Sequence, residues 1–290
     1  MFVEATVPAF TFLPVLSSVF HLFADVQLCF LHHGCGFDQI RQGALCRITF
    51  HIPTNLFIHY KVDLPPNGFI NFYASSKALG EALRSAKPSS YIDFSYDPRD
   101  HDCLCLRVRN EHNNVETHLV RLNCEPTTKP ALSACEERVM DLTNSFIRDG
   151  ALISQWFPFS HLRQALQSVR SQIDRMDPPP CELMPSADFL QWKLNVPKKS
   201  SFNSHEYLFT VLHKIDDETL FLEPFSALFW PILEIHSELS KRHSRIVVDA
   251  RKAAGGFAHH DVIQILFHMD WNLRFEVFFV HSRHSKLQEV

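Results

Sequence analysis

Histidine and cysteine are abundant enough in this chain to suggest chemistry, with 18 and 8 copies in 290 residues. His32-His33-x-Cys35 and Cys103-x-Cys105 place metal-binding side chains close together, but neither provides four ligands at zinc-like spacing. Strand alternation puts Cys103 and Cys105 on one face, which we expect to be core. His259-His260-Asp261 follows Gly255-Gly256 and is expected in a hairpin loop. The sequence therefore predicts no metal site.

Catalytic motifs are the next possibility. The chain shows no serine in a strand-turn-helix elbow, no phosphate-cradling glycine loop and no Cys/His pair in a recognisable context. Its 8 glycines include no Gly-x-Gly-x-x-Gly pattern, so a dinucleotide fold is not expected. The sequence predicts a protein that is not an enzyme and needs no cofactor.

Lysine and arginine gather on one side of a segment with helical periodicity after Ser76. Lys77, Arg84 and Lys87 fall within about 80° of one another at roughly 100° per residue. The opposite side is apolar, with Leu79, Ala82, Leu83 and Ala86. Positive charge on a helix can contact DNA phosphates without reading sequence, and such contacts weaken as salt rises. We expect this helix to have a basic face and a buried face.

Two later segments also carry such charge. After Ser160, Arg163 and Arg170 lie beside an apolar stripe, and Arg175 follows at the end. A helix expected after Glu223-Pro224 ends on Lys241 and Arg242, where the helix dipole alone favours cations. Each stripe has an alternative interpretation as an ordinary solvated helix face. The combination of three basic segments makes DNA contact the more interesting hypothesis.

These helices stand among short alternating segments that are typical of antiparallel strands. The helices are expected at Thr11–Phe23, which has no lysine or arginine, at Lys77–Ala86, at Ser160–Met176 and after Pro224. The strands are expected at Phe2–Thr6, Val26–Leu31, Leu45–His51, Ile58–Val62, Gly68–Tyr73, Tyr91–Tyr96, Cys103–Arg109, Val115–Leu122, Leu152–Phe157, Arg245–Asp249, Val262–Phe267 and Phe275–Val280. The order of strand, helix, strands, helix and strands recurs in both halves. Such recurrence predicts a duplicated α+β unit.

The composition agrees with two globular domains. Hydrophobic residues make up 46% of the chain, enough to build cores in both halves. Pro8, Pro14, Glu4 and Asp25 interrupt the apolar start, which argues against a signal peptide, and no run of about 18 apolar residues predicts a membrane span. The cysteines are expected to be reduced thiols in an intracellular protein. The net charge of −4 means that DNA contact would need local segregation of charge.

The element order resembles that of the sliding-clamp superfamily, to which the proliferating cell nuclear antigen belongs. The resemblance rests on Phe2-Val3-Glu4-Ala5, on Gly36-Phe37-Asp38-Gln39-Ile40 and on Ser75 through Asn110. Phe50 followed by Leu56-Phe57 and Tyr60, together with Thr117-His118, is more similar to the Rad-nine subunit of the heterotrimeric DNA-damage checkpoint clamp. The Ser-His-Val signature common in replicative clamps is absent where Gly43-Ala44-Leu45 stands.

The resemblance implies an architecture. It implies two tandem clamp domains at 1–122 and 146–281, an interdomain connector at 123–145 and a short tail at 282–290. In each domain, antiparallel sheets would lie outside and two helices on the inner face, so that Lys77, Arg84, Lys87, Arg163, Arg170, Arg175, Lys241 and Arg242 would face double-stranded DNA. The strand Val115–Leu122 would be one seam of the ring.

The resemblance also implies partners. These would be two related subunits, a clamp loader and client proteins whose peptides dock in an apolar groove beneath the connector, all in the nucleus. Two alternatives remain. One is a replicative or viral processivity factor that forms a homotrimer, and the other is an interaction scaffold without DNA contact, which the uncharged first helix favours.

Overall fold

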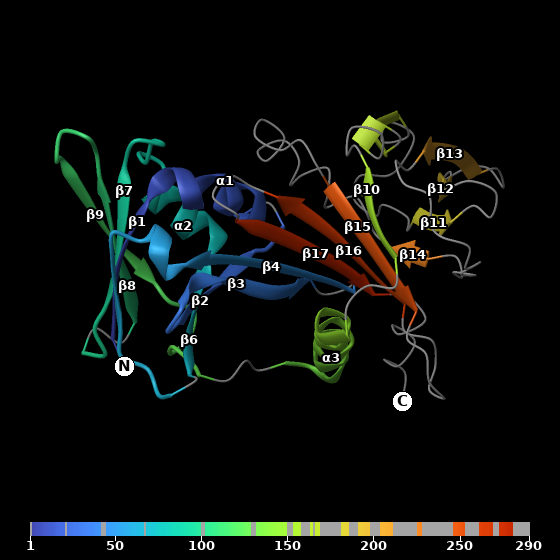
Figure 1. Cartoon of the computed structure of the whole chain (residues 1–290). Helices are drawn as coiled ribbons and strands as arrows, with labels where there is room; N and C mark the ends of the chain where they lie inside the picture. Colours follow the sequence, from blue (N-terminus) through green and yellow to red (C-terminus); the bar gives the residue numbers. More distant parts are fainter. Residues whose placement is uncertain are drawn as a thin grey trace. The chain divides into compact units, whose positions relative to one another are not determined.

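The computed structural model of the chain describes residues 2–20, 22–41, 45–66, 68–99, 102–128, 132–149, 153–157, 163–164, 166–168, 181–185, 191–197, 204–210, 225–227, 246–252, 261–268 and 273–280. The chain divides into two compact units. Unit 1 is built mainly from Met1–Gln39 and Thr49–Ala131, whereas unit 2 contains Ile40–Ile48 and most of the chain from Leu132 onward. The described elements are mostly antiparallel strands with few helices, so the fold is α+β, as predicted (Figure 1).

The first sheet of unit 1 has the strand order β5-β1-β7-β8-β9. Its strands are β1 (Val3–Pro8), β5 (His59–Val62), β7 (Tyr91–Tyr96), β8 (Cys103–Arg109) and β9 (Val115–Arg121). All four pairings are antiparallel, with Ala5 opposite Phe94 and Phe94 opposite Leu106. Alternate side chains such as Leu104, Leu106 and Val108 are buried. One face of this sheet therefore belongs to the core.

The second set of strands in unit 1 follows the order β4-β3-β2-β6. Its strands are β2 (Asp25–Leu31), β3 (Gly34–Arg41), β4 (Cys46–Pro53) and β6 (Phe69–Ser75), with a short 3-10 turn η1 (Thr54–Leu56) after β4. The strand β3 was not among the expected elements. A Cβ added at Gly36 would lie 1.9 Å from the carbonyl oxygen of Phe50. The glycine therefore permits a close backbone approach inside a strand instead of ending one.

The described part of unit 1 also contains two α-helices, α1 (Ala9–Phe20) and α2 (Ser76–Ala82). Figure 1 shows them side by side, and a Cβ at Gly80 of α2 would lie 3.6 Å from the ring of Phe20. Phe12 of α1 meets Phe94 edge-on at 5.4 Å between ring centroids, and Phe94 meets Phe30 at 5.6 Å. Because Phe94 lies on β7 and Phe30 on β2, these aromatic rings join α1 to strands of both sheets in one core.

The connector region differs from the expectation. A connector without a helix was expected at 123–145, yet the structure has a helix there, α3 (Ala134–Asp149). Ser133 begins it with a capping box, because the side chains of Ser133 and Glu136 each accept a hydrogen bond from the other's backbone N–H. Before α3, the connector pairs with β6, since Asn71 and Thr127 exchange backbone hydrogen bonds of 2.9 and 3.2 Å.

The strands of unit 2 form two sets. They are β10 (Ile153–Phe157), β11 (Cys181–Pro185), β12 (Gln191–Pro197), β13 (Ser204–Thr210), β14 (Phe225–Ala227), β15 (Ile246–Lys252), β16 (Asp261–His268) and β17 (Arg274–Val280). One set runs β10-β15-β16-β17, with the start of β4 next to β17, and the other runs β13-β12-β11-β14. The short strand β14 stands where a helix was expected to begin, directly after Pro224.

The strand connectivity recurs between the two halves of the chain. The order β10-β15-β16-β17 repeats β1-β7-β8-β9, in which one early strand pairs with the first of three late, consecutive strands. The order β13-β12-β11-β14 likewise repeats β4-β3-β2-β6. In both halves, three consecutive strands form a meander, and a later strand pairs with the first of the three. Within the part of the chain that the structure describes, no helix is both long and apolar enough to cross a membrane.

Candidate functional site

The helix α2 is positioned by its first residue. The Ser76 side chain donates a hydrogen bond to the carbonyl oxygen of Phe23, and the Ser76 N–H donates to Ala24 at 2.9 Å. These bonds fix the start of α2 to the segment that follows α1. Leu79 and Ala82 then point into the core, which leaves Lys77 exposed. The basic and apolar sides of this helix are therefore separated as predicted.

The end of α2 corrects the expectation of a helix reaching Ala86. The helix stops at Ala82, and Leu83–Ser85 continues as turns, with the Ala86 N–H bonded to Leu83 at 3.1 Å. Ser90 holds the next segment, since its hydroxyl accepts the Lys87 N–H at 3.0 Å. Arg84 and Lys87 are exposed like Lys77, but they lie on this turn region. All three cations remain within one short stretch of surface.

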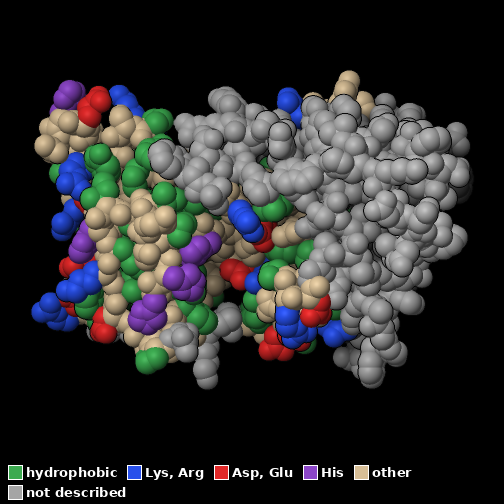
Figure 2. Space-filling model, viewed as in Figure 1, with side chains coloured by type: hydrophobic (Ala, Val, Ile, Leu, Met, Phe, Trp, Pro, Cys, Tyr) green, Lys and Arg blue, Asp and Glu red, His purple; other side chains and the backbone are tan. Residues whose placement is uncertain are grey.

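An acidic residue also belongs to this surface. Glu81 is exposed and lies four residues after Lys77, so the two side chains share a helix face. The predicted basic face therefore also carries one negative charge. Figure 2 shows blue and red side chains interspersed over the described part of the face in view. Any attraction of phosphates by the surface of α2 would come from these few cations.

The remaining cations are described only in part. Arg163 is partly exposed and lies in a helical stretch beside Leu166, which is fully buried, as the predicted stripe requires. Arg170, Arg175, Lys241 and Arg242 lie outside the described residues. The helix α1 carries no charged side chain between Ala9 and Phe20.

The strand β9 is the edge of its sheet, and its side chains are unusual for an edge. It pairs with β8 on one side, with Leu106 opposite His118. Leu119 is 72% exposed and Val115 is 52% exposed. Exposed edge strands with apolar side chains are templates for pairing with another chain. The segment Val115–Leu122, predicted as a seam, contains this edge strand.

The buried thiols are not arranged for chemistry. Cys103 and Cys105 share a strand face, but this is the partly exposed face, because Leu104, Leu106 and Val108 take the buried one. The expectation of core thiols was wrong at these two positions. Burial, with a smaller effect of Asp38, raises the pKa of Cys29 to about 12, and burial raises that of Cys46 to about 12. Such thiols stay protonated at neutral pH and are poor nucleophiles.

The two histidines of His32-His33-x-Cys35 have different neighbours. The rings of His33 and His51 lie 5.1 Å apart, and His32 Nε2 is 2.9 Å from the carbonyl oxygen of Pro65. Burial, and next the nearby His33, lower the pKa of His51. Among the described residues, no three His, Cys, Asp or Glu side chains gather as metal ligands would. His259-His260-Asp261 falls outside the described residues except for Asp261, which begins β16.

Comparisons of the whole chain with protein-family models and with curated proteins found no match.

Proposed function

We propose that this chain is a subunit of a ring-shaped DNA sliding clamp of the DNA-damage checkpoint type. The recurring strand order carries the proposal. Both halves of the chain use the orders that two copies of one α+β unit would produce, with a pair of helices on unit 1. A ring of such units holds DNA topologically, so the protein acts by binding and needs no active site.

Strand addition would close the ring. The edge strand β9 exposes Leu119 and Val115, and β13 is the end strand of the set that repeats β4-β3-β2-β6. We propose that β9 of this chain pairs with the equivalent of β13 in a neighbouring subunit, and β13 with the equivalent of β9 in the other neighbour. The two related subunits, the clamp loader, the client proteins and the nuclear location are part of the same proposal.

DNA contact would come from Lys77, Arg84 and Lys87, with Arg163, Arg170, Arg175, Lys241 and Arg242 as further candidates. Each phosphate that is neutralised releases counterions. The logarithm of the DNA-binding constant should therefore fall with the logarithm of the salt concentration, with a slope of about 0.9 per phosphate contact. The neutral α1 and the presence of Glu81 keep this contact weak. Weak contact suits a ring that must slide.

The test of DNA contact is the retention of the assembled ring on closed circular DNA. The variant K77E/R84E/K87E should lower retention several-fold at low salt and reduce its salt dependence. The control K61E/R107E makes the same kind of change at exposed positions on the sheet face opposite the buried one, and should retain DNA like the wild type. Equal retention of both variants would refute the assignment of these residues.

Two measurements separate the alternatives. Native mass spectrometry of the purified chain would show a stable homotrimer if it were a replicative or viral processivity factor, which would contradict the checkpoint proposal. The scaffold alternative is favoured by the uncharged α1. It predicts that the chain enters an assembly with partners while the assembly leaves circular DNA unbound at every salt concentration.

A further inference from the structure

The strand β8 carries two thiols on its outward side. Cys103 and Cys105 are partly exposed, whereas Leu104 and Leu106 turn toward the core. Residues two apart on a strand have Cβ atoms about 6.5–7 Å apart, but a disulfide needs Cβ atoms about 3.5–4.5 Å apart. The two thiols therefore cannot form a disulfide with each other while β8 keeps its strand conformation, and both are free.

Two arginines lie beside these thiols. In the antiparallel register, Arg121 of β9 is directly opposite Cys103. Arg107 follows Cys105 by two residues and so shares the same face of β8. Both arginines are exposed, and neither belongs to an ion pair within the parts of the chain that the structure describes. The thiols thus lie next to two positive charges that are available to an anionic molecule.

The other six cysteines lack this combination of exposure and positive charge. Burial raises the pKa of four of them, so that these thiols stay protonated at neutral pH: Cys29, Cys35, Cys46 and Cys181. Cys124 is exposed and Cys135 is partly exposed, but each is followed directly by a glutamate. A carboxylate repels an anionic reagent, whereas a guanidinium attracts it.

Cys105 has the more favourable surroundings of the two thiols on β8. The exposed Asp102 directly precedes Cys103, whereas the sequence neighbours of Cys105 are the buried Leu104 and Leu106. We therefore expect an anionic reagent to react first at Cys105.

We infer that the outward face of β8 and β9, around Cys103, Cys105, Arg107 and Arg121, is a modification site for a small anionic disulfide of the glutathione type. The carboxylates of such a molecule fit arginine, whose planar guanidinium donates two parallel hydrogen bonds to a carboxylate. The two arginines would hold the reagent while its disulfide lies over the thiols.

The reaction is thiol–disulfide exchange and needs no further oxidant. The thiolate of Cys105 attacks one sulfur of glutathione disulfide, and a bond forms between the protein sulfur and one glutathione. The disulfide bond of the reagent breaks, and the second glutathione leaves as a thiolate, which takes up the proton that Cys105 lost. Cys103 cannot displace the attached glutathione by forming a disulfide with Cys105, because their Cβ atoms are too far apart. The mixed disulfide therefore persists until an external thiol reduces it.

The attached glutathione would cover part of the edge strand. Leu119 of β9 is the cross-strand partner of Cys105 and is 72% exposed. Modification would thus change the side-chain surface of β9 from apolar to polar. That this would hinder closure of a ring rests on the proposed function, whereas the modification itself does not.

The reduced full-length chain is tested with two disulfides of different charge. Mass spectrometry of peptides should show glutathione disulfide modifying Cys105 about fivefold faster than Cys124 or Cys135 at low salt. The variant R107Q/R121Q should lose this advantage, yet react with the uncharged 4,4′-dithiodipyridine at the wild-type rate. The control K61Q removes a cation of the same sheet face about 14 Å from Cys105, three strands away, and should react like the wild type with both reagents.

The two cysteines are separated by single variants. C105S should lose most of the modification on β8, whereas C103S should keep it. The unchanged rate with the uncharged reagent also shows that R107Q/R121Q is folded, since unfolding would expose the buried thiols.

Three results would overturn the inference. One is an equal loss of rate with both reagents in R107Q/R121Q, and another is a Cys124 that reacts with glutathione disulfide as fast as Cys105. The third is an internal disulfide between Cys103 and Cys105 as the main product.

These outcomes are independent of the proposed function. Charge-dependent modification of Cys105 in a chain that never joins a DNA-retaining ring would keep the site and refute the clamp. A ring that is retained on DNA, but whose thiols do not distinguish the two reagents, would keep the clamp and refute the site.

Discussion

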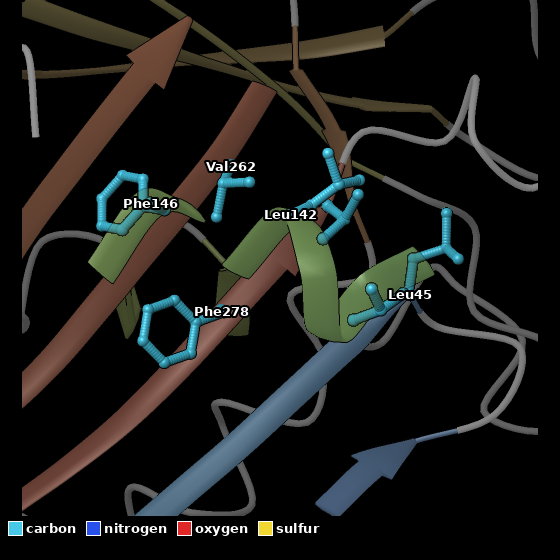
Figure 3. Packing of buried hydrophobic residues seen from close by; sticks show 7 residues of the cluster. Leu45, Leu142, Phe146, Val262 and Phe278 are labelled. Atoms are coloured by element: carbon cyan, nitrogen blue, oxygen red, sulfur yellow. The ribbon is translucent and has the colours of Figure 1, made fainter. Parts of the chain in front are cut away.

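The helices α1 and α3 have similar lengths but are held in different ways. Phe12, Leu16 and Val19 of α1 are at most 1% exposed. The Phe12 ring contacts aromatic rings that lie on strands of both sheets of unit 1. The helix α3 packs on one face of β16 and β17 through Val139, Leu142 and Phe146 (Figure 3), with the partly buried Cys135 beside them, and Arg47 donates two hydrogen bonds to it. We infer that α1 is part of the large core of unit 1, whereas α3 packs in a smaller buried cluster of unit 2.

The largest expected effect is at Phe12. Its replacement by alanine removes a ring that is 1% exposed and should lower the free energy of unfolding by about 3–5 kcal/mol. Urea denaturation measures this loss. The control Phe10→Ala changes a partly exposed ring of the same helix and should lower the free energy of unfolding clearly less. Equal losses at the two positions would mean that α1 does not form the core as described.

The replacement Phe146→Ala should have a smaller global effect. We expect α3 to open without unfolding of the strands, so that the loss of global stability stays within the free energy of α3 docking, about 1–3 kcal/mol. Hydrogen exchange should become faster across α3 but stay unchanged in β16 and β17. Loss of protection in β16 and β17 as well would contradict this prediction, because it would mean that α3 unfolds together with these strands.

A third prediction concerns the capping box of α3. Ser133→Ala removes the side chain that accepts the Glu136 N–H and should cost about 1 kcal/mol. The loss should appear as faster exchange of the first turn of α3. The helix α1 offers a contrast. Thr11 lies inside this helix, and its hydroxyl donates a hydrogen bond of 2.7 Å to the Pro8 carbonyl, so it does not cap the helix N-terminus. Thr11→Ser, which keeps that hydroxyl, should leave exchange in α1 nearly unchanged.

The smallest expected effect is a pH dependence confined to unit 1. The folded-state pKa of His51 lies below its ordinary value of 6.5, because burial and the neighbouring His33 disfavour the charged ring. The unfolded chain therefore binds this proton more readily, so the contribution to stability is present above pH 6.5 and is lost as pH falls below it. Comparison of wild type with His51→Asn in urea at pH 7.5 and 5.5 checks this. A wild type that loses no more stability than the variant at the lower pH would contradict it.

Much of unit 1 could be predicted from the alternation of side chains. The strands Tyr91–Tyr96 and Cys103–Arg109 were predicted with the bounds that the structure shows. The strand β3 was missed because Gly34 and Gly36 resemble turn residues, and only the approach of the Phe50 carbonyl explains a glycine in that strand. The helix α3 did have signals, namely the Ser133-x-x-Glu136 capping box and the spacing of Val139, Leu142 and Phe146. The Pro- and Thr-rich start of the connector concealed them.

Which residues share a face of a strand or helix can be predicted from the sequence alone, because a period of two or of about 3.6 follows from backbone geometry. That is why Lys77 and the buried Leu79 were separated correctly, and why Cys103 and Cys105 were placed together. Which of the two faces is buried depends on what packs against it, and this is seen only in the folded chain: Leu104 and Leu106 meet the core, and the two thiols face outward. The register of distant strands and the covering of Phe278 by α3 are likewise contacts between residues far apart in the chain, which no local period encodes.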